Sequence, residues 1–223
     1  MHNSTNSILS ISLNSKSSFC LLLSLSFLFL SLSNCDPKEV NLQEYLSSAN
    51  HPDKISFNHK RFSDSLQQIS KETQLTEIEM NYDAISELPQ EWGELNKLKK
   101  LSLYGNALTD LPASFHNLIN LEILLLGMNP LEQIPTSLRG LPNLRILSLD
   151  ETKLKLTEED VNILASLPNL EILDLSENPE LLQVPDNVSK LNSIKSIFLK
   201  KNKLSEEERR KIFTALPNVS LSK

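Results

Sequence analysis

The sequence contains few of the residues on which catalytic and metal sites usually depend. It has only two cysteines, four histidines and four glycines among its 223 residues. The histidines are not spaced as metal-ligand pairs, and no glycine-rich phosphate loop occurs. No serine lies in a nucleophile-elbow sequence. We therefore expect a protein that is not an enzyme, with no catalytic residues, no metal, no cofactor and no small-molecule substrate.

Positive charge is also scarce. The formal net charge is −6, and Lys16 is the only charged residue before Asp36. A nucleic-acid-binding protein needs a basic surface that displaces counterions from phosphates, so this class is excluded. The two cysteines are Cys20 and Cys35. Because Cys20 falls within a predicted leader, a disulfide framework in the mature chain is excluded as well.

The longest apolar run lies near the N-terminus, over residues 19–32, and is interrupted only by serines. It is shorter than the ~20 residues of a membrane span and suits the core of a signal peptide better. The sequence LSNC, which ends at Cys35, resembles a bacterial lipobox of the looser spirochaetal kind. This resemblance implies a signal peptide over 1–34 and lipidation of Cys35. The alternative is an ordinary signal peptide followed by a free or buried cysteine.

Most of the remaining chain is repetitive. Block two reads LKKLSLYGNALTDLPASFHNLIN and block three reads LEILLLGMNPLEQIPTSLRGLPN. All blocks agree in phase, and over residues 75–218 they resemble the leucine-rich-repeat family, with its pattern LxxLxLxxNxLxxLPxxLxxLxx. The six blocks begin at Leu75, Leu98, Leu121, Leu144, Leu170 and Ile194.

The alternation within each block predicts how the blocks stack. Positions four and six are apolar between more polar neighbours, which is the periodicity of a strand with one buried face. One block cannot bury its leucines alone, so stacked blocks should share one continuous core. The resemblance implies an α/β solenoid, a right-handed superhelix with a concave parallel β-sheet and a convex side of turns, 3-10 segments and two α-helices. Position four carries Leu101, Leu124, Leu147 and Leu173 in blocks two to five.

The convex side differs between blocks. In blocks one, two, three and five a proline follows Leu, Ile or Val, which favours extended or short helical turns. Block four reads TEEDVNILASL from Thr157, and block six reads SEEERRKIFTAL from Ser205. In each, a hydroxyl side chain precedes an acidic residue, Asp160 or Glu208, at the third helical position. This arrangement predicts an α-helix that begins with a capping box.

Polar residues recur at the ninth position of each block. In this family an asparagine there forms a ladder, because its amide can satisfy backbone groups where the chain leaves the strand. Asp83 and Thr152 depart from asparagine, so we expect a looser ladder at their blocks. The remaining ladder residues are Asn106, Asn129, Asn178 and Asn202.

Both ends of the repeat array need a cap, because a terminal repeat must turn a polar face to water. Counting back 23 residues from Leu75 places Ile55 and Phe57 on consensus apolar positions, without the Leu-Pro pair. The expected order is a signal peptide (1–34), a polar tether (35–51), a degenerate N-terminal cap repeat (52–74), six leucine-rich repeats (75–218), and a C-terminal cap strand and tail (219–223).

Positions three, five, seven and eight are expected to face the concave side, the usual binding surface of this family. Its centre is apolar where water is expected, and contiguous exposed apolar patches mark interaction sites. The other interpretation is that β-branched residues simply suit strands. Asp150, Glu151, Asp174 and Glu177 form an acidic edge that favours a basic partner. The predicted partner-binding residues are Tyr82, Tyr104, Ile123, Leu125, Met128, Ile146, Asp150, Ile172, Asp174 and Phe198.

The resemblance implies a non-catalytic protein–protein interaction module with a protein or peptide partner on its concave face. The predicted leader adds export and a membrane anchor through an N-terminal lipid, in the outer surface or facing the periplasm. Adhesion or host interaction is the leading hypothesis for such a lipoprotein. An envelope scaffold or regulatory subunit that docks another bacterial protein is the alternative, and an effector inside a host cell is a third class.

Overall fold

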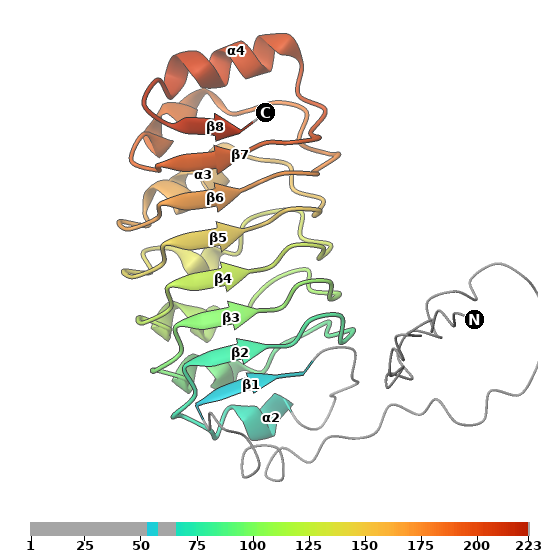
Figure 1. The fold of residues 1–223 in the computed structure, drawn as a ribbon, viewed down its shortest axis with the longest axis vertical. Helices are drawn as coiled ribbons and strands as arrows, with labels where there is room; N and C mark the ends of the chain where they lie inside the picture. The colour runs from blue at the N-terminus through green and yellow to red at the C-terminus, as the bar shows by residue number, and fades with distance from the viewer. Residues whose placement is uncertain (1–52, 58–65, 223) are drawn as a thin grey trace, which may run out of the picture. The chain divides into compact units, whose positions relative to one another are not determined.

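The chain forms a stack of short parallel strands with helical segments behind them (Figure 1). This computed structural model describes residues 53–57 and 66–222, all of which lie in one compact unit, 37–223. The predicted signal peptide, the tether and the lipidation residue Cys35 lie outside the described residues. No helix among the described residues has the length and apolar character needed to cross a membrane.

The sheet has eight strands, which pair in the order of the chain. Every neighbouring pair is parallel, so each connection returns across the helical layer before the next strand begins. Each strand is only three residues long. The strands are β1 (Lys54–Ser56), β2 (Glu77–Glu79), β3 (Lys100–Ser102), β4 (Ile123–Leu125), β5 (Ile146–Ser148), β6 (Ile172–Asp174), β7 (Ser196–Phe198) and β8 (Ser220–Ser222).

The central residue of each strand points into the core. Leu101 pairs with Leu124, Leu124 with Leu147, and Leu147 with Leu173, and all four side chains are completely buried. Position six adds a second buried row, which includes Leu103, at the end of the strands. Each buried leucine contributes about 1.5–3 kcal/mol when its neighbours are in place. The predicted solenoid with one continuous leucine core is therefore confirmed.

The asparagine ladder is present and joins successive blocks. Asn129 donates from Nδ2 to the carbonyl of Leu126 in its own block and to that of Leu103 in the preceding block, both at 2.9 Å. Asn106 and Asn202 make the equivalent bond to the preceding block. The Thr152 hydroxyl has two acceptors, the carbonyl of Leu149 in its own block and the side chain of Asn178 in the next block. The ladder is thus looser at Thr152, as the shorter side chain predicts.

Helical segments form the layer opposite the sheet. The four 3-10 segments each follow a proline, whose φ lies between −55° and −63°. Because proline fixes φ and lacks a donor, it starts these turns without losing a hydrogen bond. The segments are α2 (Leu66–Ile69), η2 (Gln90–Glu94), η3 (Ala113–Asn117), η4 (Thr136–Leu138), α3 (Glu158–Ala165), η5 (Asp186–Leu191) and α4 (Glu206–Ala215).

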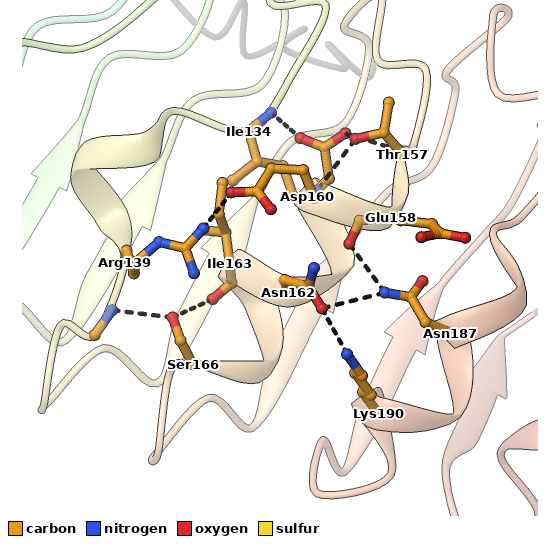
Figure 2. Close-up of polar contacts among 12 residues, drawn as sticks. Ile134, Arg139, Thr157, Glu158, Asp160, Asn162, Ile163, Ser166, Asn187 and Lys190 are labelled. Carbon is orange, nitrogen blue, oxygen red and sulfur yellow. Dashed lines mark hydrogen bonds and ion pairs between the residues drawn. The ribbon is translucent and has the colours of Figure 1, made fainter.

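Helix α3 begins as predicted. Its cap residue Thr157 accepts a hydrogen bond from the Asp160 amide, and the Asp160 carboxylate accepts one from the Thr157 amide at 2.8 Å (Figure 2). The neighbouring segment η5 contacts this helix through Asn187, which donates to the carbonyl of Glu158 and to the side chain of Asn162. These contacts hold the helix of block four against block five.

Helix α4 departs from the prediction. Ser205 caps it by accepting from the Glu208 amide at 3.1 Å, but the Glu208 carboxylate does not return to Ser205. It accepts instead from the amide of Val184, one block earlier, at 2.9 Å. The complete capping box expected there was wrong, because the Glu208 carboxylate is used by the amide of Val184 in the preceding block.

The chain's single tryptophan joins the first block to the segment before it. Trp92 in η2 is fully buried, and its indole Nε1 donates to the carbonyl of Leu66 in α2 at 2.9 Å. On the sheet side, β1 pairs with β2, and Ile55 and Phe57 are buried. Both layers therefore continue past Leu75 toward the N-terminus.

Candidate functional site

The face of the sheet opposite the leucine core carries positions three and five of each block, and we call it the open face. Position three forms a row in which Ile123 pairs with Ile146 and Ile146 pairs with Ile172. All three isoleucines are half-buried by one another and by their neighbours. The sequence predicts these isoleucines to be neighbours, and the structure pairs them. Their side chains pack together in an apolar strip and are not fully exposed.

Position five forms the second row of the open face. Leu125 pairs with Ser148, Ser148 with Asp174, and Asp174 with Phe198. These four side chains are half-buried as well. The row therefore changes from apolar in β4 to acidic in β6 and aromatic in β7, beside the isoleucine strip. That these residues contact a partner stays a prediction.

Positions seven and eight follow the strands and form an edge of the open face that we call the rim. Position eight has the same backbone conformation in all six blocks, with φ between 54° and 69°. Only Gly105 adopts this left-handed conformation without strain, since it disfavours other residues by about 1 kcal/mol or more. Five blocks keep a side chain at this strained position: Tyr82, Met128, Glu151, Glu177 and Lys201.

Two tyrosines pack over glycines on the rim. The rings of Tyr82 and Tyr104 lie edge to face, with centroids 5.6 Å apart and an angle of 71° between their planes. A Cβ on Gly105 would lie 2.5 Å from the Tyr82 ring, and one on Gly127 would lie 2.7 Å from the Tyr104 ring. The two glycines therefore provide the space that the tyrosine rings occupy.

The Tyr104 hydroxyl connects blocks two and four. It passes over Gly127 and donates to Oε1 of Glu151 at 2.5 Å, which fixes the position of that carboxylate. Burial, the hydrogen bond to Glu151 and the charge of that carboxylate raise the pKa of the Tyr104 phenol well above its usual range. The phenol thus stays a donor at any physiological pH, because its charged form is disfavoured.

Asp150 lies beside this pair, at the centre of the rim. The Ser148 hydroxyl donates to its carboxylate, and a Cβ on Gly127 would lie 2.4 Å from its Oδ1. Burial raises the pKa of the Asp150 carboxyl, and the charges of Asp174 and Glu151 raise it further, whereas the Ser148 hydrogen bond lowers it. Three carboxylates thus gather where β5 and β6 end.

Carboxylates toward both ends of the open face and its rim form ion pairs with lysines. Glu77 pairs with Lys54, and Glu79 pairs with Lys100, each at 2.5 Å across neighbouring strands. On the rim, Glu177 pairs with Lys201 at 2.8 Å. Within the part of the chain that the structure describes, no ion pair forms to the other three carboxylates of this region, Asp150, Glu151 and Asp174.

The structure places the predicted residues on two surfaces. Tyr82, Tyr104, Met128 and Asp150 belong to the rim, and Tyr82 and Met128 are the most exposed, at 44% and 46%. The other six lie in the strands of the open face: Ile123, Leu125, Ile146, Ile172, Asp174 and Phe198.

The predicted partner-binding residues leave out three members of this region, of which Glu151 was predicted only as part of the acidic edge. Glu151 receives the Tyr104 hydroxyl, Ser148 donates to Asp150, and Gly127 makes room for both Tyr104 and Asp150. Their phase in the repeat, at positions eight, five and seven, was the available signal. A cavity of about 320 Å³ lies elsewhere, between segments 109–110 and 130–136. Among the described residues, no group of histidine, cysteine and acidic side chains is arranged to hold a metal ion.

Comparison with known proteins matches part of the repeat array to a known family. The family model described as "Leucine rich repeat" matches residues 73–131. No curated protein sequence gives a significant match. Among solved structures, a leucine-rich-repeat protein of Leptospira interrogans superposes with a TM-score of 0.58 at 24% identity, covering 79% of this chain and 50% of that one. An internalin of Listeria monocytogenes gives 0.59 at 19% identity, covering 76% of this chain and 46% of the internalin. This chain thus spans about half the length of either protein, and the likeness concerns the fold.

Proposed function

We propose that this leucine-rich-repeat solenoid is a non-catalytic binding module, which holds a protein or peptide on the open face of its sheet. Stacked repeats commonly present an extended surface for such partners. The observation that carries the proposal is the isoleucine strip, in which Ile123, Ile146 and Ile172 are in register. Leu125 lies two residues along β4 on the same face, and the acidic rim follows β5 and β6. Apolar side chains beside charged ones are the usual composition of a binding surface.

The arrangement of the layers supports this choice of face. The opposite side of the sheet is filled by the leucine core, and the helical segments pack on that side. There, Asn162 of α3 accepts hydrogen bonds from the side chains of Asn187 and Lys190 of η5 (Figure 2). The open face and its rim, by contrast, carry Asp150, Glu151 and Asp174, which form no ion pair with any residue that the structure describes. Like charges gathered in this way are unfavourable for a surface with only a structural role.

Selection from a dodecapeptide display library on the full chain tests the proposal. Peptides that bind the wild-type chain should lose more than about tenfold in affinity when Leu125 and Ile146 are both replaced by aspartate, because a charge would enter the apolar strip. Ile119→Asp is the matched control, since Ile119 is 52% exposed in a loop outside the open face. Fluorescence of the buried Trp92 during denaturation reports whether each variant is folded.

Two results would overturn the proposal. Either no peptide is selected, or the selected peptides bind the Leu125→Asp/Ile146→Asp chain as tightly as the wild type while Trp92 reports a folded protein. Loss of binding in the Ile119→Asp control would also count against the open face, because it would place the peptide on the loops instead.

We further propose that the chain is an exported lipoprotein anchored through Cys35, with adhesion to another cell or to a host protein as its role. The lipobox-like sequence LSNC before Asp36 supports this proposal. A diacylglyceryl cysteine with an N-acyl chain would anchor the protein stably, at about 0.8 kcal/mol for each buried methylene.

Labelling with radioactive palmitate tests the anchor, in bacteria that express the full chain. The label should appear on the wild-type protein and be absent from the Cys35→Ala variant, and an unlabelled wild-type protein would contradict the anchor. Protease treatment of intact cells then tests the adhesive role. A surface protein is degraded, whereas protection in intact cells would favour the envelope scaffold.

A further inference from the structure

Negative charge is concentrated where the rim meets the open face. Asp150, Glu151 and Asp174 lie at the ends of β5 and β6, and no ion pair within the described part of the chain involves any of them. Elsewhere on the same face the carboxylates of Glu77 and Glu79 each have a lysine in a neighbouring strand. A lysine at the position aligned with Asp150 in either neighbouring block could pair with Asp150 in the same way. Those two positions carry glycine and serine instead.

These carboxylates are also held in place before any partner arrives. The Tyr104 hydroxyl holds Glu151 at 2.5 Å, the Ser148 hydroxyl holds Asp150, and the Ser176 amide donates to Asp174 at 2.9 Å. Each carboxylate keeps acceptor capacity, since an ionised carboxylate offers about four lone-pair sites. Pre-positioned acceptors lose less side-chain entropy when a cationic group binds.

Exposed aromatic and apolar side chains lie along the same edge as these carboxylates. Tyr82 and Met128 follow β2 and β4 on the rim, and they are the two most exposed of the predicted partner-binding residues, at 44% and 46%. Charged groups with apolar surface beside them suit a partner segment that carries both kinds of side chain.

The chemistry of the rim selects one kind of partner. Tyrosine faces and carboxylates both attract the side chain of arginine or lysine, through cation–π contact and charge-assisted hydrogen bonds. The isoleucine strip beside the rim takes an apolar side chain. We infer that the rim binds the basic side chains of a peptide segment whose apolar residues lie on the isoleucine strip. This inference rests on the proposed function of the open face.

The same library selection, carried out on the full chain, tests the inference. Selected peptides should be enriched in arginine or lysine next to leucine, isoleucine or phenylalanine. Their affinity should fall about tenfold in the Asp150→Asn/Asp174→Asn variant, since half-buried interfacial charge pairs have effects of this size. Raising the NaCl concentration should weaken wild-type binding more than binding to this variant, because salt screens the charges that the variant lacks.

Glu91→Gln/Glu94→Gln is the matched control. It also removes two negative charges, but from exposed positions of η2 in the helical layer, away from the open face and the rim. Its affinity for the selected peptides should stay within about twofold of the wild type, because long-range effects of exposed charge are screened by salt.

The outcomes separate the two proposals. If the selected peptides show no basic enrichment, or if Asp150→Asn/Asp174→Asn leaves their affinity unchanged while Leu125→Asp/Ile146→Asp abolishes it, the open face binds peptides but the rim does not select cations. If Leu125→Asp/Ile146→Asp leaves binding unchanged, or no peptide is selected, the proposed function and this inference both fail. An equal loss in the Glu91→Gln/Glu94→Gln control would also overturn the inference, since net charge alone would then decide affinity.

Discussion

The Asp160 carboxylate accepts a hydrogen bond from the backbone amide of Ile134, 26 residues earlier, at 2.7 Å (Figure 2). Its other oxygen completes the capping box with Thr157, so one side chain starts helix α3 and satisfies the preceding block. Ile134 precedes a proline and is buried. Glu208 repeats the arrangement at Val184, which also precedes a proline. Each α-helix is therefore fastened to an earlier proline turn through its third residue.

We expect Asp160→Ala to destabilise the fold by about 3 kcal/mol. The substitution removes a helix cap and leaves the buried Ile134 amide without its acceptor, and each loss is worth about 1–2 kcal/mol. Asp160 is only 2% exposed, so water cannot easily replace the carboxylate. Urea denaturation followed by circular dichroism measures the change in unfolding free energy.

The matched comparison is Glu208→Ala. It removes the equivalent bond to Val184, but Glu208 is partly exposed and does not complete a capping box. A loss of about 1 kcal/mol is expected there. Equal effects of the two substitutions would show that burial of the carboxylate does not matter to this contact.

Gly105 and Gly140 offer a second pair of variants. Both have positive φ, +69° and +73°, but only Gly105 has a neighbour in the way, the Tyr82 ring 2.5 Å from an added Cβ. Replacement by alanine should destabilise by about 1 kcal/mol at Gly140, from backbone strain alone. Gly105→Ala should be worse by at least a further ~1 kcal/mol, because the tyrosine must move. Thermal unfolding of the two variants tests this order, and a more stable Gly105→Ala chain would refute the packing of Tyr82 on the rim.

Asp150→Asn should change how stability depends on pH. The pKa of Asp150 is raised in the folded state above its ordinary value of 3.8, so the folded protein binds more protons than the unfolded chain over the pH range just above 3.8. The stability that the neutral carboxyl provides is present below pH 3.8 and is lost as the pH rises through the folded-state pKa.

Asparagine does not titrate, so the variant should escape that loss. Relative to the wild type, Asp150→Asn should therefore gain stability between pH 3 and pH 7, as measured by urea denaturation at each pH. A relative loss of stability over the same range would mean that the ionised carboxylate stabilises the fold, and that the crowding of carboxylates on the rim has no energetic consequence.

Asn129→Ala should be among the most damaging polar substitutions. The side chain is 2% exposed and bonds to Leu103, Leu126 and the amide of Leu108. Its removal leaves buried carbonyl and amide groups unsatisfied, each worth about 1–3 kcal/mol. Thr152→Ala serves as the comparison, because Thr152 makes no side-chain bond to the preceding block. We expect the smaller loss at Thr152 in urea denaturation, and equal losses would contradict the bridging role of the ladder.

The repeat sequence alone determined the fold of this protein. The phase of its leucines predicts that Leu101, Leu124, Leu147 and Leu173 are neighbours, because only stacked strands bury them all, and the structure pairs them in that register. The helices of blocks four and six were also predictable, since Thr157 and Ser205 are local signals within a few residues of the turns they start.

Only the tertiary structure decided the contacts between blocks. Asp160 reaching Ile134, Glu208 reaching Val184 and Tyr104 reaching Glu151 join residues 24 to 47 positions apart, and no local pattern specifies them. The left-handed backbone at position eight was hidden for a similar reason: apart from Gly105, the residues there do not favour it. Packing of the blocks supplies the energy that holds them in this conformation, so local sequence preferences could not reveal how the rim is built.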